Sequence, residues 1–115
     1  MKIQVLKSKI HQAVVTETEL EYVGSITIDK NLMDAVGLYE NEKVHVLNMN
    51  SGDRFETYVI EGKAGEGQIC VNGAAARLAQ KGDRVIIVSY GLIDEKEVHD
   101  WQPKIVTTNE QNEVK

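Results

Sequence analysis

The peptide bond between Gly24 and Ser25 is the part of this sequence whose residue types could do chemistry. It interrupts the strand-like stretch "EYVGSITID", residues 21–29, and a glycine within a strand marks a bulge, a bend or a close approach of backbone. A serine hydroxyl can attack the carbonyl carbon of the residue before it, which converts the peptide bond into an ester. Glycine leaves that carbonyl unshielded and tolerates strained backbone angles.

Elimination from such an ester would release a chain that ends at Gly24. Ser25 would become a dehydroalanine and, after losing ammonia, a pyruvoyl group, which is a ketone in a chain that otherwise has none. The alternative interpretation is a glycine bulge followed by a surface serine. The dipeptide alone favours this alternative, because Gly-Ser is common.

Few other side chains suggest a site. His11, His45 and His99 have no mutual spacing for a metal, and the sequence predicts no metal site. The single thiol, Cys70, excludes an internal disulfide and a cysteine-cluster metal site. We interpret it as a small buried apolar residue, because it lies in the apolar run "QICVNG". Phosphate-binding loops, nucleophile elbows and dinucleotide fingerprints are also missing.

The overall composition predicts one soluble globular domain over residues 1–115, with a mass of 12.8 kDa. The formal charge of −5 disfavours a duplex-DNA partner, since such binding depends on a surplus of Lys and Arg. Neither a secretory signal nor an apolar run long enough to span a membrane is found in the sequence, so we expect a cytoplasmic protein without a membrane partner.

Patterns typical of β-strands dominate the chain, and two short helices interleave with them. The helix over 30–38 should stop near Gly37, and an Ala-rich helix over 73–82 should stop at Gly82. Trp101 and Pro103 are expected to hold part of the polar C-terminal segment to the body, whereas roughly 108–115 should form a flexible tail. The predicted strands are 9–20, 24–29, 42–49, 54–62, 67–73 and 83–91.

An internal repeat relates residues 24–47 to residues 67–88. Ile26 aligns with Ile69, Ile28 with Val71, and Asp29 with Asn72; Gly24 aligns with Gly67, and after a two-residue gap Glu42, Lys43 and Val44 align with Asp83, Arg84 and Val85. Two halves with one apolar face each would close on each other and remove exposed sheet edges. We therefore predict a mainly β, six- to seven-stranded barrel with pseudo-twofold symmetry and two or three short helices. Chance similarity of two β-rich segments is the alternative.

Several linked stretches give the sequence a family resemblance. They are "KSKIHQAVVT", "YVGSITID", "AVGLYENEKVHVLN", "GDRFETYVI", "VNGAAARLAQKGDRVIIVSY" and a late W-x-P. In order and spacing they resemble the pyruvoyl-dependent aspartate 1-decarboxylases, which convert L-aspartate to β-alanine and CO2 for pantothenate and coenzyme A biosynthesis. The resemblance covers about the first hundred residues.

This resemblance implies a double-psi β-barrel, self-cleavage after Gly24 into chains 1–24 and 25–115, and a homotetramer with active sites at subunit boundaries. The covalent pyruvoyl cofactor would derive from Ser25 and form a Schiff base with the substrate amine. Whether a maturation partner assists the cleavage is left open. The other implied positions are Tyr58 as proton donor, Lys9 and Arg54 as carboxylate binders, Thr57 near the cleaved carbonyl, and a pocket lining of Asn72, Gly73, Ala74 and Ala75.

The chemistry of these residue types suits those roles. An arginine fork matches a carboxylate, a phenol can supply a proton, and a conjugated carbonyl is an electron sink for decarboxylation. Each residue also has a plainer interpretation. Arg54 could be a surface cation, Tyr58 could be packing, and Asn72 could cap a helix. Strict alternation places Arg54 and Tyr58 on one strand face and Thr57 on the other.

Two non-enzymatic alternatives remain at this point. The segment 24–47 also resembles the unit of swapped-hairpin transcription regulators, which dimerise to bind DNA. Both the negative charge and the presence of two half-repeats in one chain disfavour that alternative. An inactive barrel kept for assembly would be expected to have lost Ser25 or Tyr58, and both are present.

Overall fold

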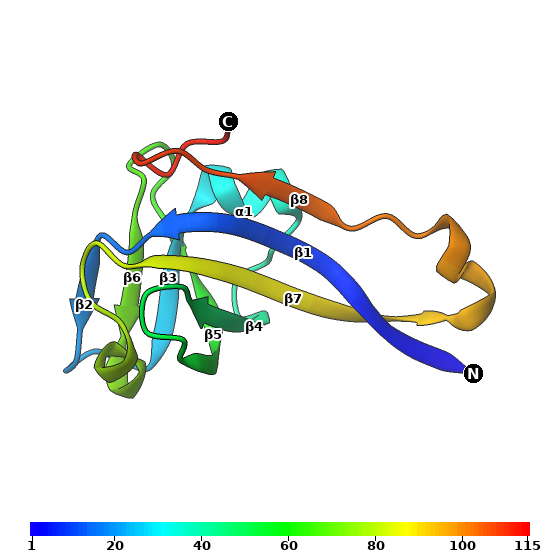
Figure 1. The fold of residues 1–115 in the computed structure, drawn as a ribbon, viewed down its shortest axis with the longest axis horizontal. Helices are drawn as coiled ribbons and strands as arrows, with labels where there is room; N and C mark the ends of the chain where they lie inside the picture. The colour runs from blue at the N-terminus through cyan, green and yellow to red at the C-terminus, as the bar shows by residue number, and fades with distance from the viewer.

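The computed structural model describes all residues from 1 to 115 as one eight-stranded sheet curled around a core, with three short helices (Figure 1). The predicted mainly β class is confirmed; the strand predicted over 9–20 is divided between β1 and β2, and β8 is an additional strand. The strands are β1 (Lys2–Val14), β2 (Glu17–Glu19), β3 (Ser25–Asp29), β4 (Lys43–Asn48), β5 (Arg54–Gly62), β6 (Ile69–Asn72), β7 (Arg84–Asp94) and β8 (Lys104–Thr107). The helices are α1 (Lys30–Val36) and the 3₁₀ helices η1 (Gly73–Leu78) and η2 (Glu95–Asp100).

The pairing of β3 with β6 confirms the internal repeat. These strands run antiparallel, with Ile26 opposite Val71 and Ile28 opposite Ile69. The repeat aligns Ile26 with Ile69 and Ile28 with Val71, so each of these pairs maps onto the other when the halves are exchanged. The same symmetry relates β4 and β7. Val46 lies opposite Ile87, its own counterpart in the repeat, so this pair maps onto itself when the halves are exchanged. A pseudo-twofold axis therefore passes between the two halves.

The remaining strands interlock the two halves. β5 pairs antiparallel with β4 and parallel with β3. In the other half, β1 pairs antiparallel with β7, and its continuation β2 pairs parallel with β6. Each half is thus completed by a strand from another part of the chain, which is the arrangement of a double-psi β-barrel.

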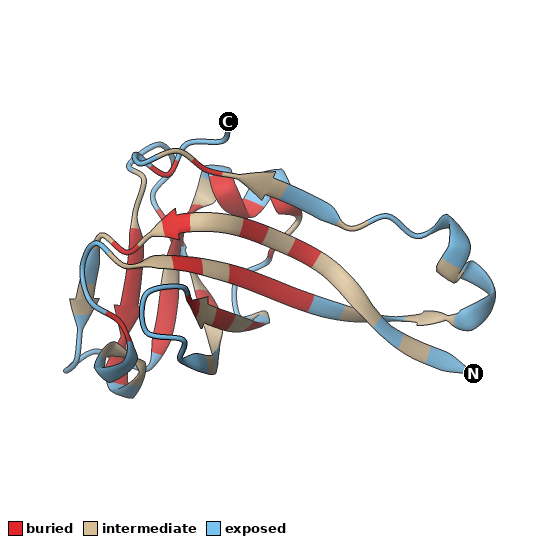
Figure 2. Ribbon diagram, in the orientation of Figure 1, coloured by how far each residue is buried: buried red, intermediate tan, exposed pale blue.

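The barrel core is built from the alternate residues of these strands. Seventeen buried apolar residues form one cluster. Figure 2 colours buried residues red, and they lie mostly in the strands of the barrel and in α1. Complete burial of one Val, Leu or Ile side chain contributes about 1.5–3 kcal/mol. The completely buried residues of the central strands include Ile10, Ile26, Ile28, Val44, Val46, Val59, Ile69, Val71, Val85 and Ile87.

Helix α1 begins and ends where the sequence predicts. Asp29 caps its start by accepting a hydrogen bond from the Asn31 backbone N–H, and Gly37 ends it in the left-handed conformation at φ +71°. The same Asp29 carboxylate also accepts bonds from the backbone N–H groups of Gly65 and Gly67. This residue therefore fixes the start of α1 and the loop before β6 together.

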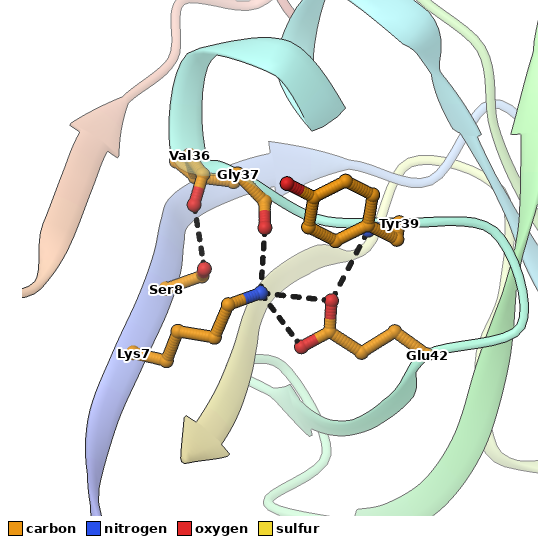
Figure 3. A network of polar contacts seen from close by, with 6 residues as sticks. All are labelled: Lys7, Ser8, Val36, Gly37, Tyr39 and Glu42. Carbon is orange, nitrogen blue, oxygen red and sulfur yellow. Dashed lines mark hydrogen bonds and ion pairs between the residues drawn. The ribbon is translucent and has the colours of Figure 1, made fainter. Parts of the chain in front are cut away.

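The C-terminal end of α1 is held to β1 by two side chains (Figure 3). The Ser8 hydroxyl donates to the Val36 carbonyl at 2.6 Å. The Lys7 ammonium donates to the Gly37 carbonyl at 2.6 Å and to both carboxylate oxygens of Glu42 at 2.9 Å. Cations at a helix C-terminus offset the partial negative charge of its free carbonyls. Lys7 is thus occupied by a structural role.

The second predicted helix is shorter than expected. It is a 3₁₀ helix that ends at Leu78, because Ala79 is already extended, and Gly82 lies in the following turn at φ +93°. Its first residue, Gly73, has φ +71°, which is incompatible with the start of an α-helix. The Ala-rich composition indicated a helix, but the backbone at Gly73 prevents a regular one.

The C-terminal segment is held against the body at two places. The Trp101 indole N–H donates to the Leu6 carbonyl at 2.7 Å, which confirms the predicted anchoring by Trp101. The flexible tail expected over 108–115 stays a prediction, and part of this segment packs against the barrel. Asn112 is buried, and its carboxamide bonds to the backbone of Val14 in both directions and to the Gly67 carbonyl. None of the helices is long and apolar enough to cross a lipid bilayer.

Candidate active site

The register of the sheet places Ser25, Tyr58 and Asn72 in one row across three strands. Ser25 lies directly opposite Asn72 in the β3–β6 pair. Ile26 lies level with Val59 in the parallel β3–β5 pair, so the preceding residues, Ser25 and Tyr58, are level too. Because Ile26 and Val59 face the core, this row lies on the outer face of the sheet.

Ser25 is the first residue of β3, and its side chain is completely buried. Its hydroxyl donates to the Val23 carbonyl at 2.9 Å and accepts a hydrogen bond from the Asn72 carboxamide at 3.0 Å. The alternative of a bulge followed by a surface serine is therefore wrong. Gly24 is exposed and lies just before the strand rather than inside it.

Asn72 does not cap the helix that follows it. No cap hydrogen bond forms at the start of η1, in contrast to Asp29, its counterpart in the repeat. The Nδ2 atom of Asn72 instead donates to the hydroxyls of Ser25 and Thr27, each at 3.0 Å. The plainer interpretation of Asn72 as a helix cap is thus wrong, and its side chain belongs to the environment of Ser25.

The start of η1, directly after Asn72, lies against the backbone of Gly24. A Cβ atom on Gly73 would lie 2.5 Å from the Gly24 Cα, 2.7 Å from the Gly24 nitrogen and 3.1 Å from the Tyr22 carbonyl oxygen. Only glycine fits this approach and also adopts φ +71° without strain. The next two residues, Ala74 and Ala75, are exposed and half-buried, and they continue this helix.

Thr57 and Tyr58 lie on opposite faces of β5, as strand alternation predicts. Thr57 is opposite the core residue Val44, and Tyr58 is opposite Lys43 at the sheet's outer face. Both side chains are half-buried. Tyr58 therefore shares a face with Ser25, whereas Thr57 lies on the core side of the neighbouring position.

Lys9 and Arg54 are not brought to Ser25 within one chain. Lys9 lies on β1, and β5, β4 and β7 separate that strand from β3 in the sheet order. Arg54 begins β5, four residues before Tyr58, which is about 13 Å along a strand. Neither forms an ion pair with a carboxylate of the same chain, whereas the nearby Lys7 is engaged by Glu42.

Sequence interpretation missed Cys70 and Thr27 as neighbours of the site. The Cys70 thiol donates to the Asn72 Oδ1 atom at 3.0 Å. Burial raises the pKa of the Cys70 thiol to about 11, with smaller contributions from Glu17 and Glu19. The missed signal was the i, i+2 spacing of Cys70 and Asn72, which places both on one strand face.

The fold and the site together define a double-psi β-barrel whose reactive candidate is a backbone bond next to a buried serine. The family model described as "Aspartate decarboxylase" matches residues 1–115. The chain belongs to the aspartate decarboxylase family.

Curated relatives named aspartate 1-decarboxylase support this assignment. The protein from Caldicellulosiruptor bescii is 59% identical over 99% of this chain and 89% of the relative. The protein from Acetivibrio thermocellus is 56% identical over 99% of this chain and 90% of the relative. The crystal structure of the rationally designed mkDPBB_sym1 protein is similar with a TM-score of 0.48 and 20% identity, over 74% of this chain and 96% of that one. The DNA-binding and scaffold alternatives have no support among these matches.

Proposed function

We propose that this chain cleaves itself between Gly24 and Ser25 and then decarboxylates L-aspartate to β-alanine and CO2, which feeds pantothenate synthesis. Family membership supports the activity. The observation that carries the proposed cleavage is the buried Ser25 hydroxyl, held between the Val23 carbonyl and the Asn72 amide next to an exposed Gly24. The proposal includes a cytoplasmic homotetramer, and the cleavage products are residues 1–24 and 25–115.

The first step is attack of the Ser25 hydroxyl oxygen on the Gly24 carbonyl carbon. A new C–O bond forms, the peptide C–N bond breaks, and the Ser25 nitrogen gains a proton. The Val23 carbonyl orients the hydroxyl hydrogen in the precursor. The Asn72 N–H group stabilises the negative charge on Oγ as its proton leaves. Gly24 assists because its carbonyl has no side chain beside it.

The second step separates the two chains. The Ser25 Cα loses a proton, the bond between Cβ and Oγ breaks to leave a dehydroalanine at position 25, and Gly24 departs as a carboxylate that keeps this oxygen. Water then replaces ammonia at position 25 and leaves the pyruvoyl group. The surroundings fit this small planar group, since the Gly73 backbone approaches where a Cβ would collide and the Asn72 amide donates at the same place.

In turnover, the pyruvoyl carbonyl supplies an electron sink for the loss of CO2 from the substrate's α-carbon. Tyr58 protonates the carbon that loses CO2, and its sharing the outer face with position 25 supports this role. Lys9 and Arg54 hold the substrate carboxylates through charge-assisted hydrogen bonds. We also assign Thr57 to the cleaved carbonyl, as the family resemblance implies.

The positions of Lys9 and Arg54 support an active site that is shared between subunits. Arg54 is about 13 Å along β5 from Tyr58, and Lys9 lies on a distant strand. A neighbouring subunit that brings one of these cations to position 25 would complete the site. The structure leaves both cations without an intrachain carboxylate partner, which suits this use.

The direct test compares two serine variants in an aspartate decarboxylation assay that measures β-alanine. Ser25→Ala should release none, because it lacks the hydroxyl that cleaves the chain. Ser51→Ala is the matched control, since Ser51 lies in an exposed turn and its hydroxyl only accepts a bond from the Asp53 N–H. Substantial β-alanine formation by Ser25→Ala would refute the proposed cofactor.

A further inference from the structure

Four polar side chains gather on the outer face of β3 and β6 around one carboxamide. Ser25 lies opposite Asn72, and Thr27 lies opposite Cys70. The Asn72 Nδ2 atom donates to both hydroxyls, and its Oδ1 atom accepts from the Cys70 thiol. Cys70 and Asn72 are both buried, with 3% and 2% of their surface exposed. The Cys70 thiol is therefore linked to the Ser25 hydroxyl by two hydrogen bonds, both of which the Asn72 carboxamide makes.

The hydroxyls alone do not fix which way the Asn72 carboxamide points. A serine or threonine hydroxyl can donate or accept, so Ser25 and Thr27 could bond to the oxygen of a carboxamide turned by half a rotation. In that orientation the Ser25 hydroxyl would donate to Asn72 and give up its bond to Val23. The orientation matters because only the Nδ2 atom can stabilise negative charge on Oγ.

The Cys70 thiol distinguishes the two orientations. A thiol that keeps its proton is a weak donor to the amide oxygen, and its sulfur is a weak acceptor for the amide N–H. The orientation seen satisfies this thiol donor and also keeps the Ser25 bond to Val23. Burial, followed by the nearby Glu17 and Glu19 carboxylates, raises the pKa of Cys70 to about 11, so the thiol keeps its proton at neutral pH. The arrangement seen, with Oδ1 toward sulfur and Nδ2 toward Ser25, is the one that a protonated thiol favours.

We propose that Cys70 is a positioning residue for self-cleavage, whose thiol holds the Asn72 carboxamide with its N–H groups toward Ser25. This inference rests on the proposed self-cleavage and adds a residue to it. Cys70 touches neither the cleaved bond nor the substrate, and it acts only through Asn72. Its removal changes how fast the precursor matures.

The test measures the cleavage rate of freshly purified precursor by intact mass. Cys70→Val fills similar space without a donor, and it should slow cleavage about threefold to tenfold, the size expected for loss of one hydrogen bond. Cys70→Ser keeps a donor and should cleave within about twofold of the unmodified chain. Thermal unfolding of each precursor identifies a variant that fails to fold, and Cys70→Ala then replaces Cys70→Val as the variant without a donor.

A second arm separates positioning from a general structural role. In an Asn72→Ala background, Cys70→Val should have no further effect on the cleavage rate, because the carboxamide that it orients is gone. Unchanged cleavage in Cys70→Val would overturn the inference, as would an equal loss in Cys70→Ser or an undiminished effect beside Asn72→Ala. If the unmodified chain itself does not cleave, the proposed function fails instead, so the two failures are distinguishable.

Discussion

Position 25 combines burial, two hydrogen bonds and an exposed preceding glycine. The Ser25 hydroxyl donates a hydrogen bond to the Val23 carbonyl and accepts one from the Asn72 carboxamide. Two hydrogen bonds hold this hydroxyl in one position, and a fixed position favours its reaction with a neighbouring carbonyl. Tyr58 shares this face of the sheet, which supports its proposed role as the proton donor to the substrate.

Replacing Tyr58 by Phe should separate maturation from turnover. The Tyr58→Phe precursor should cleave at the normal rate, because the hydroxyl has no part in forming the ester. Turnover should fall by about 10²-fold or more, the usual contribution of a positioned proton donor. Steady-state β-alanine release from fully cleaved protein measures this effect, and unimpaired turnover would remove Tyr58 from its role.

The raised pKa of Cys70 predicts how stability depends on pH. The folded chain holds the thiol proton up to about pH 11, whereas the unfolded chain releases it near 9.0. The contribution of the protonated thiol to stability is therefore complete below 9.0 and is lost as the pH rises toward about 11.

Urea unfolding of Ser25→Ala precursors, with and without Cys70→Val, checks this pH dependence. The Ser25 substitution prevents cleavage during the measurement. The Cys70-containing precursor should lose stability relative to the Cys70→Val precursor between about pH 8 and about pH 10.5. A constant difference across this range would contradict the raised pKa.

At the scale of elements, the two half-repeats use equivalent positions for different purposes. Asp29 caps α1 and binds two loop amides, whereas Asn72 leaves η1 uncapped and turns toward Ser25. Gly73 follows with a positive φ and brings its backbone against Gly24. The first half-repeat has a strand, a capping residue and a helix in order. The candidate site lies where the second half-repeat lacks this cap, at Asn72.

Gly73→Ala tests this close approach. The new Cβ would lie 2.5 Å from the Gly24 Cα, in addition to the cost of φ +71° for a residue with a side chain. Gly52→Ala is the matched control, because Gly52 has φ +80° but no atom within 4 Å of its Cβ position. Gly73→Ala should lower the free energy of unfolding by about 1–3 kcal/mol more than the control does, as measured by urea unfolding, and should slow cleavage. Equal effects would show that the contact with Gly24 is unimportant.

The sequence predicted the strands, the first helix and the repeat, because these follow from local alternation and from Gly and Asp at α1's ends. It did not predict the shortened η1, since composition carries no information on the positive φ that Gly73 adopts beside Gly24. The burial of Asn112 within the tail was not predicted, because it depends on partners at Val14 and Gly67, far away in the sequence. Cys70 was overlooked because its role appears only when β6 pairs with β3.

At the scale of the whole molecule, one chain holds the proposed cleavage bond, whereas the two cations proposed to bind the substrate lie elsewhere. Lys9 and Arg54 lie away from Ser25, and the paired ends of β1 and β7 extend as an arm beyond the barrel (Figure 1). Tyr90 and Leu92 on this arm are exposed. Such a shape suits a chain that completes its site by association with copies of itself.

Mixed assemblies of two inactive variants test whether the site is shared. Ser25→Ala lacks the pyruvoyl group, and Arg54→Ala lacks the carboxylate-binding cation. If Arg54 acts on the neighbouring subunit's position 25, coexpression should restore up to about a quarter of the sites, because random mixing pairs an intact position 25 with an intact Arg54 at that frequency. β-Alanine release by the purified mixture measures this recovery. Absence of any recovery would place Arg54 and Ser25 in the same subunit's site.

The central claim, that Ser25 becomes a pyruvoyl group, is tested most directly by the intact mass of the protein before and after incubation. We predict two fragments, residues 1–24 and 25–115, whose summed mass differs from that of the 12.8 kDa precursor only by the exchange of one ammonia for one water. A single uncleaved species in preparations that form β-alanine, or fragments whose sum exceeds the precursor by one whole water, as simple hydrolysis gives, would contradict the claim.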